Sequence, residues 1–244
     1  MPLIRGCSHL LLDIEGTTCP VSFVAGSLFP YAARRLESFL GSQQQDPEVQ
    51  RLLGAVEKAW RQDDDPEAQA LWRNRDEPMP AAAYLQLLIQ KDRKLTALKE
   101  LQGMVWRAGY ANGELVAPLF DDVAPALERW HHQGVVLAVY SSGSVEAQQL
   151  LYGHSKGGDL RGLFSYWFDT RSGAKQEPHS YTGIAKVMEV APERVLFISD
   201  SLAECEAAEA VGMAVLFSDR ESNPHRQAGG FARISDYSSL ILEP

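Results

Sequence analysis

The fold of this 244-residue chain is predicted first from the stretch LLLDIEGTT, residues 10–18. Three leucines lead directly into Asp13, and a continuous apolar run that ends at a turn is typical of a strand buried on both faces, as in a parallel sheet. Asp13 and Glu15 then place two carboxylates at the carboxyl end of that strand, where open α/β folds bind their ligands. Taken alone, the stretch is more simply explained as a strand followed by a polar turn.

A long helical region separates this first strand from the next. Between about residues 24 and 120, apolar residues recur at helical spacing and strand patterns are nearly absent. Asp46 and Thr96 stand where helix N-caps are expected, and the acidic run 63–65 is interpreted as a solvated break. We therefore predict a helical domain over residues 19–120, inserted into a core formed by residues 1–18 and 121–244.

From residue 122 onward, short apolar runs alternate with helical patterns. Such alternation predicts a parallel sheet with helices on both faces, which is a Rossmann-like α/β fold. The predicted strands of this part are residues 135–140, 166–168, 195–198 and 214–217.

Polar side chains follow the predicted strands at the points where the strands end. The carboxyl ends of parallel strands meet at one edge of a sheet, so these groups are expected to lie close together although they are distant in sequence. They are Asp13 and Glu15 after the first strand, Ser141 and Ser142 after the second, Lys175 in the loop after the third, and Asp200 after the fourth.

These residue types suit chemistry on a phosphate monoester. Such a group carries about two negative charges near neutral pH, so a carboxylate nucleophile needs that charge offset. Asp13 and Asp200 offer the hard oxygen ligands that Mg²⁺ prefers. Lys175 adds a second positive charge, worth about 4 kcal/mol at roughly 4 Å and an effective dielectric near 20 before desolvation. Ser141 can donate its hydroxyl to a phosphate oxygen.

Each residue also has an ordinary structural interpretation. Glu15 alone would be a solvated loop acid, the two serines turn residues, and Lys175 a surface lysine. Asp200 could cap the helix that begins near residue 203. Glu204 could be a first-turn acid favoured by the helix dipole, with at most an indirect role beside the reacting groups. The argument therefore depends on the four strand ends taken together.

Composition excludes several classes of function. The net charge of −9 makes nucleic acid and anionic membranes unlikely partners. Three cysteines without a C-x-x-C pattern indicate neither a disulfide framework nor a zinc site. The cysteines are interpreted as reduced thiols of a cytoplasmic protein. No leader-like or membrane-spanning segment is evident. Nothing in the sequence requires more than a monomer.

Four segments carry a resemblance to a known family. The pattern DxxGT after an apolar strand resembles the first motif of the haloacid-dehalogenase-like phosphohydrolases. DIEGTT itself resembles one branch, the enolase-phosphatases (acireductone synthases) of methionine salvage. Three further segments are also similar to that branch: VYSSGSVEAQQLL at 139–151, FDTRSGAK at 168–175 and LQGMVWRAGYANGEL at 101–115.

The resemblance implies a Rossmann-like core, a helical cap inserted after the first strand, and one Mg²⁺ per subunit. It also implies roles for the candidate residues. These are nucleophile and metal ligand for Asp13, metal binding through the backbone carbonyl and acid/base chemistry for Glu15, substrate binding for Ser141 and Ser142, phosphate binding for Lys175, and metal binding for Asp200. Glu204 stands where many relatives carry a second acid.

The implied substrate is 2,3-diketo-5-methylthiopentyl-1-phosphate, which the family enolises and then dephosphorylates to the acireductone 1,2-dihydroxy-3-keto-5-methylthiopentene. The enolisation base is left open between Glu15 and a residue of the cap. One alternative is a general sugar-phosphate or nucleotide phosphatase of the same superfamily. Another is a non-catalytic phospho-acceptor module resembling a response-regulator receiver, although receivers are about half this length and lack an inserted domain.

Overall fold

The computed structural model describes residues 3–74 and 80–243, and within them the chain forms two compact units. One unit comprises the chain up to Phe23 and from Val116 onward, and the other comprises Val24–Leu115. The predicted domains divide at residues 18 and 121 instead, and that division stays a prediction. The proline at position 78, expected to precede a helix, lies outside the described residues.

The first unit carries the strands. Its sheet strands are β2 (His9–Leu12), β3 (Val136–Tyr140), β4 (Phe164–Phe168), β5 (Val195–Ser199), β6 (Ala214–Ser218) and β7 (Arg233–Ile234). Its helices are α1 (Val21–Phe23), α7 (Val123–His132), α8 (Val145–Gly153), α9 (Pro178–Val187) and α10 (Leu202–Glu209), with the short helices η2 (Arg161–Leu163), η3 (Thr170–Ser172) and η4 (Pro192–Arg194).

The six strands form one parallel sheet in the order β4-β3-β2-β5-β6-β7. From β2 the chain moves outward through β3 to β4, and from β5 it moves outward on the other side through β6 to β7. The connections therefore leave β2 and β5 in opposite directions, which makes the gap between their carboxyl ends the topological switch point of the sheet. Open α/β sheets bind ligands at such a point.

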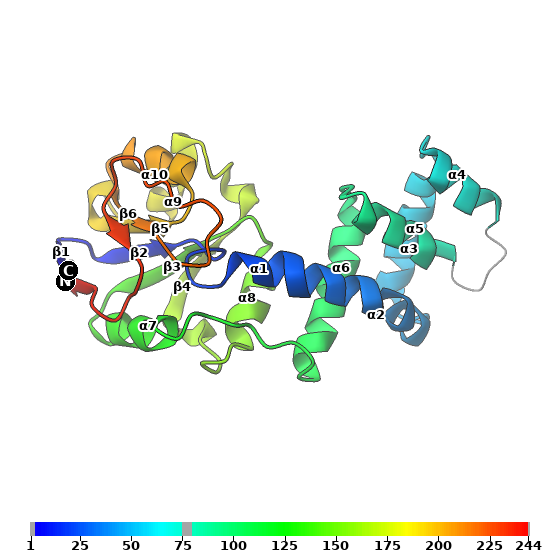
Figure 1. Cartoon of the computed structure of the whole chain (residues 1–244), viewed down its shortest axis with the longest axis horizontal. Helices are drawn as coiled ribbons and strands as arrows, with labels where there is room; N and C mark the ends of the chain where they lie inside the picture. The colour runs from blue at the N-terminus through cyan, green and yellow to red at the C-terminus, as the bar shows by residue number, and fades with distance from the viewer. Residues whose placement is uncertain (1–2, 75–79, 244) are drawn as a thin grey trace. The chain divides into compact units, whose positions relative to one another are not determined.

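Helices cover both faces of this sheet. Figure 1 shows α9 and α10 on one side and α7 and α8 on the other. The leucines of β2 are fully buried, as expected for a central strand covered on both faces. On one face Leu11 packs with Tyr140, Tyr181 and Phe197 in a buried cluster. This architecture confirms the predicted α/β fold class.

A second, two-stranded sheet was not predicted. Strands β1 (Leu3–Arg5) and β8 (Ile241–Glu243) pair in parallel and bring the two ends of the described chain together. Each strand has three residues that are mostly exposed, so neither shows a buried run or a clear alternation of apolar and polar residues.

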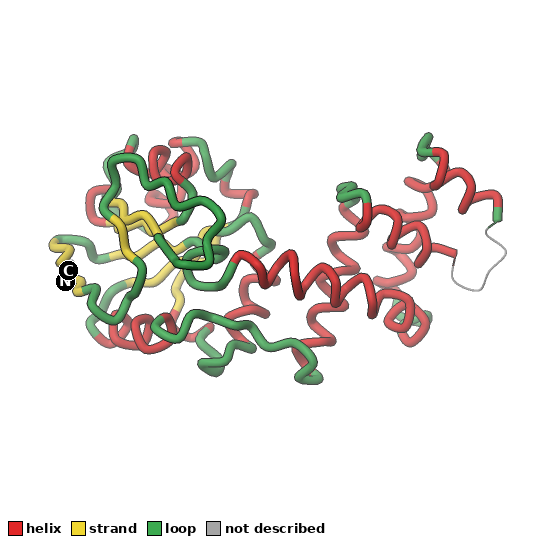
Figure 2. Tube along the Cα trace, in the orientation of Figure 1, coloured by secondary structure: helices red, strands yellow, loops and turns green. Residues whose placement is uncertain are grey.

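The second unit is helical. It contains η1 (Val24–Leu28), α2 (Phe29–Ser42), α3 (Pro47–Arg61), α4 (Pro66–Arg73), α5 (Pro80–Gln90) and α6 (Thr96–Ala111). Figure 2 shows these helices joined by loops, without a strand among the residues described here. In its core, Trp60 stacks on Tyr84 with ring centroids 4.9 Å apart and donates its indole N–H to the carbonyl of Ala68 at 2.8 Å. No helix among the described residues is long and apolar enough to cross a membrane.

Of the two helix N-caps predicted from the sequence, the structure confirms one and not the other. The Asp46 carboxylate accepts the backbone N–H groups of Glu48 and Val49, so the predicted N-cap of α3 is confirmed. Thr96 is instead the first helical residue of α6. Leu95 occupies the N-cap position and makes no side-chain capping bond. The predicted Thr96 cap is therefore wrong by one residue.

The run 63–65 separates α3 from α4, as predicted, but it is only partly solvated. Asp63 is buried, accepts the Tyr84 hydroxyl at 2.8 Å, and pairs with Arg93 at 2.7 Å. Asp65 caps α4 by accepting the N–H of Glu67 at 2.9 Å. A run of three acids is normally solvated, and here one of them is buried because a basic and a phenolic partner reach it from elsewhere in the helical unit.

We expect opposite effects from two glycine substitutions on α6. A Cβ on Gly109 would lie 2.5 to 2.6 Å from three atoms of the Tyr31 side chain, whereas a Cβ on Gly103 would meet nothing within 4 Å. Gly109→Ala should therefore destabilise the protein by about 1–3 kcal/mol. Gly103→Ala should stabilise it by up to about 1 kcal/mol through helix propensity. Urea denaturation of both variants checks this, and equal effects would contradict the close packing of α2 on α6.

Candidate active site

The centre of the candidate site lies at the switch point of the sheet. Asp13 follows β2 and Asp200 follows β5, and the Asp13 backbone N–H donates to the Ile198 carbonyl at 3.0 Å as the ladder of these strands ends. The Asp13 side chain is buried, with 8% of its surface exposed. Adjacent parallel strands thus place two carboxylates at one edge of the sheet.

The loop after Asp13 is a tight turn. The backbone N–H groups of Thr17, Thr18 and Cys19 all donate to the Ile14 carbonyl, at 3.1, 2.8 and 2.9 Å. Gly16 has a φ of +70°, which disfavours any residue with a side chain. A Cβ at Gly16 would also overlap the Asp200 carboxylate. Glycine is therefore required here, both for the turn and for the close approach of Asp200.

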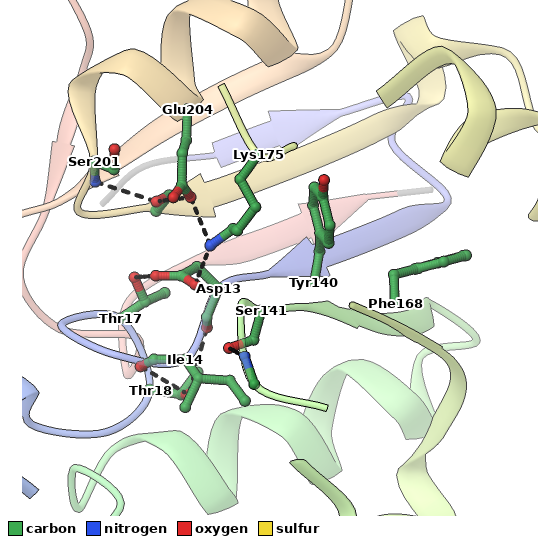
Figure 3. Close-up of polar contacts among 12 residues, drawn as sticks. Asp13, Ile14, Thr17, Thr18, Tyr140, Ser141, Phe168, Lys175, Ser201 and Glu204 are labelled. Atoms are coloured by element: carbon green, nitrogen blue, oxygen red, sulfur yellow. Dashed lines mark hydrogen bonds and ion pairs between the residues drawn. The ribbon is translucent and has the colours of Figure 1, made fainter. Parts of the chain in front are cut away.

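Lys175 reaches the same centre from the loop between β4 and α9. Its ammonium lies 2.5 Å from a carboxylate oxygen of Asp13 and 2.7 Å from one of Glu204, and Figure 3 shows it pointing between these two acids. The side chain is 10% exposed. The Tyr181 hydroxyl donates to the Lys175 carbonyl at 2.7 Å, which fixes the backbone of the loop.

Glu204 takes a larger part in this cluster than the sequence indicated. One of its carboxylate oxygens pairs with Lys175 and also accepts the Ser199 hydroxyl at 2.9 Å. Glu204 is a first-turn acid of α10, as the sequence indicated, but it contacts Lys175 directly rather than having at most an indirect role. The first turn of α10 directs its carboxylate back across the end of β5 (Figure 3). Thr17 was also overlooked, and its hydroxyl donates to Asp13 at 3.4 Å.

Burial and mutual repulsion raise the pKa values of the acids in this cluster. The pKa of Asp200 rises to about 7 because of burial and because of the charges of Asp13 and Glu204. The pKa of Glu204 is raised by burial and by Asp13, against the opposing effect of Lys175. Burial and the Asp13 charge also raise the pKa of Glu15. Carboxyl groups therefore outnumber ammonium groups at the centre.

The pKa of the Lys175 ammonium is also raised, although burial acts on it in the opposite direction. Burial by itself lowers the pKa of Lys175, but the adjacent carboxylates of Asp13 and Glu204 outweigh this and raise it overall. Lys175 is therefore charged throughout the physiological range. A buried ammonium held between two carboxylates is a fixed positive charge at the point where Asp13 would meet an anionic group.

The two serines lie at the end of β3 and differ in exposure. Ser141 is buried, its backbone N–H donates to the Phe168 carbonyl at 3.1 Å, and its hydroxyl accepts the Gly143 N–H at 3.4 Å. Ser142 is exposed. Gln148 of α8 donates to the carbonyls of Gly143 and Phe168, both at 2.8 Å, and so holds this loop against β4.

The donor set fits a divalent cation in part. Among residues 3–74 and 80–243, no three His, Cys, Asp or Glu side chains are arranged to hold a metal ion by themselves. Mg²⁺, however, is commonly held by one or two carboxylates together with waters and substrate phosphates. Asp13 and Asp200 meet that need, and the charges of Asp13 and Glu204, together with burial, raise the pKa of Asp200.

The fold and this site define a class of protein. Residues 7–212 match the sequence pattern of the haloacid dehalogenase-like hydrolases. The structure of CbbY from Rhodobacter sphaeroides shares the fold, with a TM-score of 0.57 over 97% of both chains at 20% sequence identity. The chain is thus a hydrolase of this class.

Closer relatives identify the branch. The chain is 53% identical over 215 residues to a protein of Synechococcus sp. (strain RCC307) named enolase-phosphatase E1, covering 88% of this chain and 86% of that protein. A protein of the same name from Synechococcus sp. (strain CC9902) is 48% identical over 90% of this chain and 92% of its own length. The UTR4 protein of Saccharomyces cerevisiae superposes with a TM-score of 0.73 at 32% identity, over 96% of this chain and all of that chain. The chain belongs to the enolase-phosphatase family, which confirms the resemblance found in the sequence.

Proposed function

We propose that this enzyme converts 2,3-diketo-5-methylthiopentyl-1-phosphate to the acireductone by enolisation followed by dephosphorylation. Membership of the enolase-phosphatase family supports both half-reactions. The observation that carries the phosphatase half is the buried contact of Lys175 with Asp13 at the switch point of the sheet. The identity of 48% and 53% to proteins named enolase-phosphatase E1 does not favour the alternative, a general phosphatase of the same class.

In the phosphatase half, an Asp13 oxygen attacks phosphorus and the bond to the substrate oxygen breaks, which leaves an aspartyl-phosphate. Glu15, partly buried two residues beyond Asp13, gives a proton to the departing oxygen. Water then cleaves the acyl phosphate and releases inorganic phosphate. Lys175 orients the Asp13 carboxylate and offsets the charge of the phosphate, while Ser141 and Ser142 bind its oxygens.

We propose that one Mg²⁺ is held by Asp13, Asp200 and the backbone carbonyl of Glu15. When bound, the cation offsets phosphate charge and brings the anionic phosphate to the anionic nucleophile. The excess of carboxylates over ammonium groups at this edge supports a cation there. Glu15 and residues of the helical unit are the candidates for the enolisation base.

All of these residues come from one chain, so we propose that the enzyme works as a monomer. Light scattering after size-exclusion chromatography tests this. The three cysteines are free, as is usual in a reducing compartment. Their state supports a location in the cytoplasm.

The decisive experiment measures phosphate release from the diketone phosphate, with and without Mg²⁺, while ultraviolet absorbance follows the enediol. Metal-dependent phosphate release together with the enediol signal is the expected result. Release from ordinary sugar phosphates at comparable rates would favour the general phosphatase instead. Stable phosphorylation of Asp13 without turnover would indicate a phospho-acceptor module.

Asp200→Asn should raise the Mg²⁺ concentration that gives half-maximal activity by at least about tenfold, because it removes a charged ligand. Phosphate release titrated with Mg²⁺ measures this. The matched control is Asp169→Asn, since Asp169 also follows a strand of the sheet but pairs with Arg171 at 2.9 Å. An unchanged metal titration in Asp200→Asn would remove Asp200 from the metal site.

A further inference from the structure

Asn223, in the loop between β6 and β7, contacts the turn that follows Asp13. Its side-chain nitrogen donates to the Gly16 carbonyl at 2.8 Å and to the Ser218 carbonyl at 3.3 Å. Carbonyl oxygens accept hydrogen bonds but cannot donate them, so both contacts require the amide nitrogen on this side. The residue is 6% exposed. The orientation of the amide is therefore fixed.

The other end of this amide has no partner. The Asn223 Oδ1 atom is buried and accepts no hydrogen bond from the described part of the chain. Buried acceptors without a donor are rare and need a specific explanation. Neither of the two contacts of Nδ2 can be exchanged to satisfy Oδ1, because rotating the amide would face oxygen against two carbonyls.

The unpartnered oxygen lies beside the Asp200 carboxylate. A Cβ built on Gly16 would lie 3.0 Å from Asn223 Oδ1 and would overlap the carboxylate of Asp200. Two acceptors, Asn223 Oδ1 and an Asp200 carboxylate oxygen, thus lie near each other on the same side of Gly16. A water molecule carries two hydrogens and can donate one to each, and buried waters characteristically join polar groups left without protein partners.

We propose that an ordered water bridges these two acceptors, donates to Asn223 Oδ1 and to the Asp200 carboxylate, and so makes Asn223 a positioning residue for Asp200. The water would hold the carboxylate in one orientation, in the way that outer partners orient metal ligands. The consequence for cation binding rests on the proposed function, whereas the water itself does not.

Ser218 provides the matched control. Its hydroxyl donates to the same Gly16 carbonyl at 2.8 Å, on the same turn. Ser218→Ala removes one support of the turn and leaves Asn223 Oδ1 in place. Asn223→Ala removes a support of the turn and the acceptor of the water together. The difference between the two variants therefore reports the water-mediated contact.

A crystal structure of the wild-type protein, grown with a chelator and without divalent cations, tests the water directly. We expect a water within hydrogen-bond distance of both Asn223 Oδ1 and an Asp200 oxygen. The absence of a water bridging the two acceptors, or a protein donor to Asn223 Oδ1, would overturn the proposal. This result is independent of catalysis and of metal binding.

Direct Mg²⁺ binding, measured by isothermal titration calorimetry without substrate, tests the consequence. Asn223→Ala should bind Mg²⁺ about tenfold more weakly than wild type, and Ser218→Ala should lose much less. Equal losses would reduce Asn223 to a support of the turn and overturn the positioning role. A wild-type protein that binds no Mg²⁺ would refute the proposed metal site, while the crystal structure would still decide on the water. Thermal melting of both variants identifies a loss due to unfolding.

Discussion

Asp13→Asn is expected to lower the rate of phosphate release by on the order of a thousandfold or more, because an amide oxygen cannot form the acyl phosphate. The fold should persist. Lys175 keeps its pairing with Glu204 at 2.7 Å, and an asparagine oxygen can still accept the Thr17 hydroxyl. Phosphate release and thermal melting, measured on the same preparation, separate loss of chemistry from loss of structure.

Asp13→Asn also tests whether Asp13 serves the enolisation as well as the dephosphorylation. If Asp13 acts only as the nucleophile, the variant still enolises the diketone, and the absorbance of the enol phosphate appears without phosphate. If both signals vanish while the fold is intact, Asp13 or the groups it orients also serve the enolisation. The matched control is Asp169→Asn, which should keep both signals. Appreciable phosphate release by Asp13→Asn would remove Asp13 as the nucleophile.

The sequence predicts the meeting of Asp13, Lys175 and Asp200 for a geometric reason. All parallel strands of one sheet end at one edge, so polar residues just beyond apolar runs are brought together whatever the length of chain between them. The insertion of the helical unit does not disturb this rule, because β2 still pairs with β3 on one side and β5 on the other. The motif DIEGTT then indicates the enolase-phosphatase branch within the haloacid-dehalogenase-like phosphohydrolases.

The remaining contacts depend on features that no local pattern contains. Glu204 joins Lys175 because of how α10 is turned relative to β5, and spacing alone also fits a solvated first-turn acid. Ser218 supports Gly16 from the last position of β6, and Asn223 supports it from the loop between β6 and β7, which has little periodicity. The role of Asn223 depends on the path of that loop. Irregular segments are positioned by tertiary contacts, so their residues cannot be assigned from the sequence.

Lys175→Met should cost both activity and stability. The variant leaves the buried carboxylates of Asp13 and Glu204 without their ammonium partner, and breaking a buried ion pair costs about 3–5 kcal/mol. Urea denaturation of the metal-free protein measures the loss. Lys186→Met, at an exposed position of α9, is the control and should change the free energy of unfolding by no more than about 0.5 kcal/mol.

The dependence of this loss on pH identifies its electrostatic origin. Lys175 lowers the raised pKa of Glu204, so its removal raises that pKa further. A carboxyl whose pKa is higher in the folded than in the unfolded state loses stability as pH rises through the folded value. The deficit of Lys175→Met relative to wild type should therefore shrink between about pH 8 and about pH 5, as the folded state takes up protons. Added Mg²⁺ should also reduce it, if the cation binds among the same carboxylates. A deficit that is constant across pH and indifferent to Mg²⁺ would mean that Lys175 contributes packing rather than charge.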